Sequence, residues 1–297
     1  LGDLYIRANN DMGEGVKAYL AAIQKTPTVR LLMRIDEITR TDQQLPNQEL
    51  IVMAKGPFSK LHPIAGAIEA KALQNLGRNR DALLAMERSW RLFQQAIDKG
   101  WIPHQALGSW FLDLKELFKE DPSAGESFVR ELVNGPLSQH QLVGLAGYYH
   151  AFGDDYVEHA IEILNNALDS TEVQQEARIQ LLMMLGGILV DAKRFEESES
   201  TFRKLADESD SPLVQNNLAY VIGVYQNRPE EGLIIAKKAA MKAPRESAIV
   251  DTVATMYQRL GEYDQAAKAL DFLLQLDPAN SKAMAKLSLL YSDKLGE

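Results

Sequence analysis

Apolar residues recur along this chain at spacings of three and four, which is the pattern of an amphipathic helix. In residues 247–280 they form two groups: Val250, Val253, Ala254 and Tyr257, then Ala266, Leu270 and Leu273. Gly261 stands between the groups and Pro278 follows the second one. Glycine can adopt the left-handed conformation that ends a helix, and proline cannot continue one. The segment therefore predicts two helices joined by a tight turn.

The same pattern occurs again at intervals of about 34 residues. The segments that begin at Ser247 and Ser281 start 34 positions apart, and those from Ile179 and Pro212 start 33 positions apart. The segment from Pro212 carries one extra residue in its turn. A single helix pair cannot bury its apolar face, whereas stacked pairs bury a continuous core. The periodic residues are therefore predicted to form a core rather than a reactive site.

Small residues mark the places where paired helices are expected to cross. In the units that begin at 179, 212 and 247 they occupy the eighth and the twentieth positions, leaving out of the count the extra residue of the unit from Pro212: Gly186, Ala219 and Ala254, then Ser198, Gly232 and Ala266. The glycines of the stretch LLMMLGGILV are expected to lie in the middle of a helix and to permit close packing there.

This order of residues resembles the tetratricopeptide repeat, a helix–turn–helix unit of about 34 residues. The resemblance implies an all-α fold, a right-handed α-α superhelix (solenoid) of tandem units. The better-matched units are residues 105–138, 139–178, 179–211, 212–246 and 247–280, followed by a terminal helix at 281–297. Residues 1–104 form degenerate units at 1–27, 28–62 and 63–104. We expect one continuous solenoid with a joint near residues 99–104.

The N-terminal part gives more local expectations. Helices are predicted on both sides of Pro46, and the second helix of the unit 63–104 is predicted to run long and to end near Gly100. Trp90, Trp101 and Trp110 are predicted to cluster in a buried joint; the alternative is an exposed aromatic patch. LGDLY at the start matches the middle of a unit, and the chain stops after one helix, so we expect both ends to be cut from a longer array.

Charge limits the classes of partner. The net charge is −9, with 17 basic and 17 acidic residues in 1–138 but 15 basic and 24 acidic residues in 139–297. Such a surface repels phosphate backbones, so we expect no nucleic-acid partner and a protein or peptide partner of basic character. No apolar run approaches the ~18 residues of a membrane span, so no direct membrane insertion is expected. The compartment stays open between cytoplasm and periplasm, since the chain has no cysteine.

Reactive groups are scarce. None of the histidines, His62, His104, His140, His150 and His159, stands three or four residues from another, as metal-binding pairs on a helix do. GDDYVEH at 153–159 is interpreted as an expanded turn, and no phosphate-binding loop or nucleophile elbow is present. We therefore expect no catalysis, no metal and no cofactor.

The resemblance also implies where a partner would bind. In this family the first helix of each unit lines an inner groove, and the groove positions fall here on residues that suit an extended peptide. The candidate groove residues are Asn216, Asn217, Tyr220, Asp251, Thr255, Gln258, Arg259, Met183 and His150. Lys282 and Lys286 match two basic positions of the clamp with which some members hold a C-terminal carboxylate. Asp251 and Thr252 stand where that clamp needs neutral or basic donors, so we do not expect it.

The function predicted is a non-catalytic scaffold that binds a protein or peptide in its concave groove. One alternative is the recruiting arm of a larger multidomain protein. The succession NNLAY…DTVATMY resembles bacterial arrays of cell-envelope export and polysaccharide assembly, which favours a bacterial origin. Another alternative is an RNA-binding helical repeat of 35-residue units; the acidic charge and the spacings of 33 to 35 argue against it.

Overall fold

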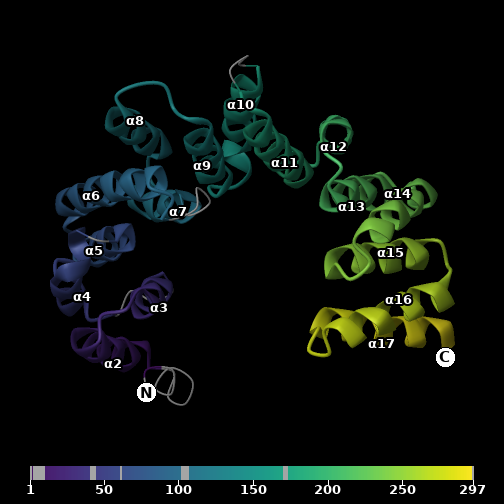
Figure 1. The fold of residues 1–297 in the computed structure, drawn as a ribbon, viewed down its shortest axis with the longest axis horizontal. Coiled ribbons are helices and arrows are strands. Elements are labelled where there is room, and N and C mark those ends of the chain that lie inside the picture. The colour runs from purple at the N-terminus through teal and green to yellow at the C-terminus, as the bar shows by residue number, and fades with distance from the viewer. Residues whose placement is uncertain are drawn as a thin grey trace. The chain divides into compact units, whose positions relative to one another are not determined.

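The computed structural model describes residues 2, 11–40, 45–60, 62–101, 107–169 and 173–295. Within these ranges the chain is helical and contains no β-strand (Figure 1). It divides into two compact units, Leu1–Tyr156 and Val157–Glu297. The boundary falls inside the predicted unit 139–178, and the unit boundaries given above stay predictions. The two compact units are described separately below.

The first unit is a succession of helices that match the predicted stretches. Two of them lie on either side of Pro46, and one is 20 residues long and is followed by Gly100 in a left-handed conformation, as predicted. The helices are α2 (Met12–Lys25), α3 (Val29–Thr39), α4 (Asn47–Ala54), α5 (Pro63–Asn75), α6 (Asn79–Asp98), α7 (Leu107–Leu117), α8 (Pro122–Val133) and α9 (Gln139–His150). Short 3₁₀ turns occur at Pro57–Lys60 and Asp154–Tyr156, the latter within the predicted expanded turn.

The second compact unit contains the better-matched repeats from residue 179 onward. Its helices are α10 (Val157–Leu168), α11 (Gln175–Asp191), α12 (Phe195–Glu208), α13 (Pro212–Tyr220), which continues into a π-helix at Val221–Tyr225, α14 (Pro229–Lys242), α15 (Ser247–Arg259), α16 (Tyr263–Leu276) and α17 (Ser281–Leu295). Helices α11 and α12, α13 and α14, and α15 and α16 pack as antiparallel pairs (Figure 1). Each pair also packs on the next, through α12 and α13, α14 and α15, and α16 and α17. The predicted all-α array of packed helix pairs is confirmed; the handedness of a superhelix stays a prediction.

Five of the turns inside helix pairs contain one residue with positive φ, whereas the turn between α7 and α8 contains none. Glycine provides it in three units, at Gly77, Gly153 and Gly261, with φ of 72°, 92° and 74°. Lys193 and Asn227 occupy the corresponding turns with φ of 59° and 55°. A residue with a β-carbon pays about 1–2 kcal/mol for this conformation. The turn geometry is therefore imposed by the packing of the two helices and persists where the sequence offers no glycine.

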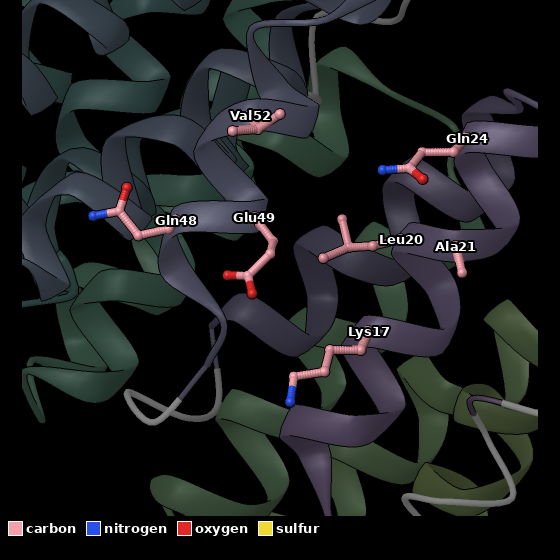
Figure 2. Close-up of a pocket in the computed structure, with 7 residues that line it drawn as sticks. All are labelled: Lys17, Leu20, Ala21, Gln24, Gln48, Glu49 and Val52. Carbon is pink, nitrogen blue, oxygen red and sulfur yellow. The ribbon is translucent and has the colours of Figure 1, made fainter.

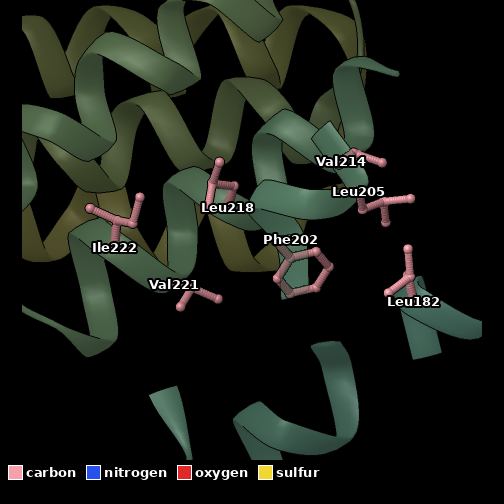
Figure 3. Packing of buried hydrophobic residues seen from close by; sticks show 7 residues of the cluster. All are labelled: Leu182, Phe202, Leu205, Val214, Leu218, Val221 and Ile222. Atoms are coloured by element: carbon pink, nitrogen blue, oxygen red, sulfur yellow. The ribbon is translucent and has the colours of Figure 1, made fainter. Parts of the chain in front are cut away.

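The core of the second unit is shared between neighbouring pairs. One cluster consists of Leu182 on α11, Phe202 and Leu205 on α12, and Val214, Leu218, Val221 and Ile222 on α13 and the π-helix (Figure 3). Each of these side chains is buried. Because the cluster joins three successive helices, neither pair buries its apolar face without the other.

Close approach of paired helices depends on the small residues that the repeat places at the crossing. A β-carbon on Gly186 would lie 2.6 Å from the Phe202 ring, and the Ser198 hydroxyl donates to the Gly186 carbonyl at 2.8 Å. A β-carbon on Gly232 would lie 2.9 Å from the Ala219 carbonyl oxygen. The prediction of close packing is wrong for Gly187, where a β-carbon would meet nothing within 4 Å. Gly187 is on the exposed side of the same helix.

Two of the three tryptophans form the predicted buried contact. Trp90 on α6 and Trp110 on α7 are buried, with ring centroids 4.6 Å apart. Trp101 does not join them: 69% of it is exposed, and the Lys99 ammonium lies 4.4 Å above its ring. The predicted cluster is thus a pair. Much of the predicted joint, including His104, lies outside the described residues.

A partly buried ionic cluster joins α3 to α7 in the first unit. Arg40 Nη2 lies 2.9 Å from Asp36 Oδ2 and 3.1 Å from Asp113 Oδ2. Lys71 Nζ on α5 lies 3.6 Å from Glu116 Oε2 at the edge of the cluster. Burial raises the pKa of the Asp113 carboxyl to about 7, although the neighbouring Arg40 guanidinium acts to lower it. The Arg40 guanidinium contacts both the Asp36 and the Asp113 carboxylates. Protonation of Asp113 removes one of these two negative charges, which a second cation would otherwise have to balance.

The adjacent glycines of α11 give a first test. Gly186→Ala places a methyl group against the Phe202 ring, and we expect it to lower the free energy of unfolding by about 1–3 kcal/mol. Gly187→Ala adds a methyl group to open space in a helix, and we expect a rise of about 0.5–1 kcal/mol. Urea denaturation followed by circular dichroism measures both. Equal effects of the same sign would contradict the assignment of the two faces.

Asp113 gives a test by pH. Its raised pKa means that the folded state holds a proton that the unfolded state releases, so its contribution to stability is lost as pH rises to about 7. We expect the urea midpoint of the wild-type protein to fall from about pH 5 to about pH 8 by more than that of Asp113→Asn. Asp98→Asn, an exposed aspartate at the end of α6, is the control and should behave like wild type. An unchanged pH dependence in Asp113→Asn would refute this role.

Candidate functional site

The second unit contains a hollow of about 460 Å³ beside the first helices of its last repeats. Side chains from four helical segments line it: Tyr220 and Val224 from α13 and the π-helix, Thr255, Gln258 and Arg259 from α15, Tyr263 from the start of α16, and Lys282 and Lys286 from α17. Four of these, Tyr220, Thr255, Gln258 and Arg259, belong to the predicted groove. The hollow is wide enough for a side chain with part of its backbone, and it is open to solvent.

The wall on the α13 side is made by an irregular helix. The Gln226 amide donates to the Val221 carbonyl at 3.1 Å, which is the five-residue step of a π-turn. This turn lies where the unit carries its extra residue. Tyr220 directly precedes the turn and Val224 lies within it, so the turn determines where both lining side chains stand.

The α17 side of the hollow carries two lysines, and a carboxylate on α15 neutralises one of them. Lys286 Nζ lies 2.5 Å from Asp251 Oδ1 and donates to the Thr255 hydroxyl at 3.0 Å. Lys282 Nζ is farther away, 3.9 Å from Asp251 Oδ2, and 74% of the Lys282 side chain is exposed. Lys286 is therefore committed to Asp251 across the α15–α17 contact, whereas Lys282 extends into solvent. Asp251 itself does not line the hollow.

Hydrogen-bond donors dominate the lining. Arg259 is exposed, and its Nη1 lies 3.5 Å from Asn227 Oδ1, which is a weak contact. Together with Lys282 it leaves two cations facing the solvent-filled hollow, and the lining contains no carboxylate. The hydroxyl of Tyr220 and the amide of Gln258 can donate or accept. This combination suits an anionic or carbonyl-rich group.

The remaining predicted groove residues are engaged within the fold. Asn217 Nδ2 lies 3.3 Å from Met183 Sδ, which links α13 to α11. Asn216 is 93% buried, since its exposed fraction is 7%, and its Oδ1 accepts no hydrogen bond from the residues described. Asn216 therefore faces the packed interior although its neighbour Asn217 reaches the surface. His150 ends α9 and belongs to the first unit, so it is not part of this hollow.

Two lining residues were not predicted, and two were predicted for another role. Val224 was not predicted, although the count from Pro212 places it at the groove position that Arg259 occupies in the next unit. Tyr263 was not predicted because it begins a second helix. Lys282 and Lys286 were recognised only as basic positions of a clamp. Their separation into a committed and an available cation depends on Asp251, which the sequence places 31 and 35 residues away.

A second hollow, of about 380 Å³, lies between α2 and α4 of the first unit (Figure 2). Leu20, Ala21 and Val52 form its apolar part, and Lys17 and Glu49 lie at its edge. Val52 is 69% exposed. Opposite charges at the edge cancel, so this hollow has no preference for the charge of an occupant.

The described residues offer neither a metal-binding cluster nor a membrane-spanning helix. No group of three or more histidine or acidic side chains there could hold a metal ion. None of the helices in the described ranges combines the length and the apolar composition that crossing a membrane requires.

Comparisons with known proteins give likenesses of fold. No protein-family model matches the chain, and no curated protein matches it. Among solved structures, a chain of the APC/C hetero-tetramer Cut9–Hcn1 is 9% identical with a TM-score of 0.47, over 93% of this chain and 52% of that one, so this chain spans about half its length. YrrB, described as a TPR protein with an unusual peptide-binding site, is 12% identical with a TM-score of 0.42, over 80% of this chain and 96% of YrrB. MamA of RS-1 is 14% identical with a TM-score of 0.45, over 59% of this chain and 97% of MamA.

All three TM-scores lie below 0.5. The chain's own helices form the array of packed pairs that the sequence predicts. The bacterial origin stays a prediction.

The two lysines of α17 give a test of the ionic contacts. Lys286→Met keeps the apolar stem but leaves the largely buried Asp251 carboxylate without its cation, and we expect a loss of about 1–2 kcal/mol in the free energy of unfolding. Lys282→Met is the matched control, with an expected change below about 0.5 kcal/mol because its contact is exposed. Thermal unfolding of both variants measures the two losses in stability. Similar losses in the two would show that Lys282 is also committed to the fold.

Proposed function

We propose that this protein is a non-catalytic, protein-binding repeat scaffold and that it holds an extended segment of a partner along the first helices of the second unit. The hollow between α13, α15 and α17 is the main contact point of that segment. The observation that carries this proposal is a preformed hollow whose lining comes from three successive repeats and offers donors without competing carboxylates.

The chemistry of the lining fits a peptide. An extended segment presents backbone carbonyl and amide groups every few ångströms, and Gln258, Thr255 and Tyr220 can pair with them. Lys282 and Arg259 add two cations that can each make a charge-assisted hydrogen bond to a carboxylate. Because the helices are packed by their own cores, the side chains are held before binding and less entropy is lost on association.

The proposed partner has two different charge preferences, one for its surface as a whole and one for the segment that enters the hollow. The excess of acidic residues in 139–297 acts over the whole surface and favours a partner with basic regions, as predicted above. The hollow itself is lined by cations, so we propose that the part of the partner entering it carries an aspartate, a glutamate or a terminal carboxylate. Lys286 is already paired with Asp251, so this contact differs from the C-terminal carboxylate clamp described in the sequence analysis.

The role as recruiting arm of a larger protein, in cell-envelope export or elsewhere, is compatible with this binding mode and stays a prediction. It concerns what the chain is joined to, and the hollow would serve the same purpose in either case.

Selection of short random peptides on the immobilised protein tests the proposal. We expect the selected peptides to be enriched in aspartate and glutamate. Fluorescence polarisation with one selected acidic peptide should then give a tenfold weaker affinity for Lys282→Met and for Arg259→Met, which is about 1.4 kcal/mol each. Added salt should weaken binding, because the contacts are partly exposed.

Lys204→Met is the matched control, since Lys204 is an exposed lysine on α12 away from the lining. It removes the same charge and should leave the affinity unchanged. Equal losses in all three variants would indicate a nonspecific charge effect, and no loss in any would rule out this hollow as the contact point.

A further inference from the structure

We propose that the π-helix Val221–Tyr225 is the specificity element of the hollow: it supplies an apolar wall, so that the accepted segment carries an apolar side chain beside the acidic one. This inference rests on the proposed function. It adds an apolar residue to the acidic residue that the hollow is proposed to bind. Three independent features of the π-helix lead to it.

The first feature is the position of the extra residue. The turn residue with positive φ is the fifteenth residue in the units that begin at 139, 179 and 247, but the sixteenth in the unit that begins at 212, where it is Asn227. One additional residue in an α-helix would rotate everything after it by about 100° and misplace the turn. The π-turn absorbs that residue, so α14 still packs on α13 and the repeat continues.

The second feature is a close contact that only glycine permits. A β-carbon on Gly223 would lie 2.2 Å from Met256 Sδ, and Met256 is completely buried on α15. The same position holds Val190 and Gln258 in the neighbouring units. The π-turn is therefore drawn against α15 at Gly223, and the next residue, Val224, lines the hollow.

The third feature is that the π-turn is anchored on the preceding repeat. The Tyr225 ring stacks on the Phe195 ring, with centroids 4.9 Å apart and an angle of 10° between the planes. Gln226 Nε2 donates to the Phe195 carbonyl at 3.0 Å. The Tyr220 ring meets the edge of Tyr225 with centroids 5.6 Å apart. The wall formed by Tyr220 and Val224 is thus held from the α12 side.

The consequence for recognition follows from the neighbouring repeats. The groove position of Val224 holds Asp191 in the unit before and Arg259 in the unit after. Among the three units from 179 to 280, only the one with the π-turn has an apolar, half-buried residue at this position. A bound segment would therefore meet Val224 and the Tyr220 ring on the α13 side and Lys282 and Arg259 on the other side. An acidic residue next to an aliphatic or aromatic residue satisfies both walls.

Two variants separate the π-turn from the side chain it carries. Deletion of Val224 restores the spacing of the other units and removes the reason for the π-turn. Val224→Arg keeps the π-turn and installs the side chain found at this position in the next unit. The probe is the acidic peptide selected on the wild-type protein, and circular dichroism and thermal unfolding check the fold.

We expect the deletion variant to bind the selected peptide at least tenfold more weakly, while Lys204→Met binds it as wild type does. Peptides selected on Val224→Arg should keep their acidic residues, or gain more, but lose the apolar neighbour. Truncation in Val224→Ala should weaken binding only about threefold, since it removes two methyl groups and leaves the turn in place.

Several outcomes would overturn the inference. If the deletion variant is folded and binds as wild type does, the π-turn has no part in recognition. If the deletion prevents folding, Val224→Arg decides, and an unchanged apolar preference in its selected peptides refutes the proposal. Wild-type peptides that are acidic without an apolar neighbour refute it while leaving the proposed function intact, and the absence of any selected peptide overturns both.

Discussion

Coverage of each apolar helix face by the next helix is the interaction on which this structure depends. The clusters around Phe202 and around Leu270 each draw side chains from more than one helix pair. No pair has enough apolar surface to fold by itself, so stability is gained at the contacts between neighbours. The crossing residues set how close these neighbours come. Where the twentieth position is Ser198, the hydroxyl bonds to the opposite backbone and the approach is kept.

This use of the apolar faces leaves the other faces of the first helices free for polar residues. Several of these polar residues bond to one another across adjacent repeats, as Lys286 does with Asp251 and Lys71 does with Glu116. Such contacts tie successive first helices together and reduce the number of groups available to a partner. The candidate site in the second unit stands out because two of its cations, Lys282 and Arg259, are not consumed in this way.

The features that distinguish this chain from a regular array are its departures from the repeat. An array of identical units would present the same groove at every step. Here one inserted residue produces the π-helix. The π-turn forms one connected local structure with the Gly223 contact and the Tyr225–Phe195 stack. The ionic cluster of α3 and α7 is a departure of another kind, in which burial of two carboxylates beside one guanidinium shifts a pKa toward neutrality.

The sequence by itself determined the helices, their pairing and most turns, because apolar spacing, glycine and proline act locally and recur with the repeat. It also placed Tyr220, Thr255, Gln258 and Arg259 together, since groove positions follow from the count within a unit. The tertiary structure decided what counting cannot: that Asn216 is buried while Asn217 is not, that Gly186 is packed and Gly187 is open, and that Lys286 is paired while Lys282 is available. It also showed that the inserted residue becomes a π-turn bearing Val224. Each of these depends on which atoms of another helix lie within a few ångströms, and side chains far apart in the chain meet only when the repeats have stacked.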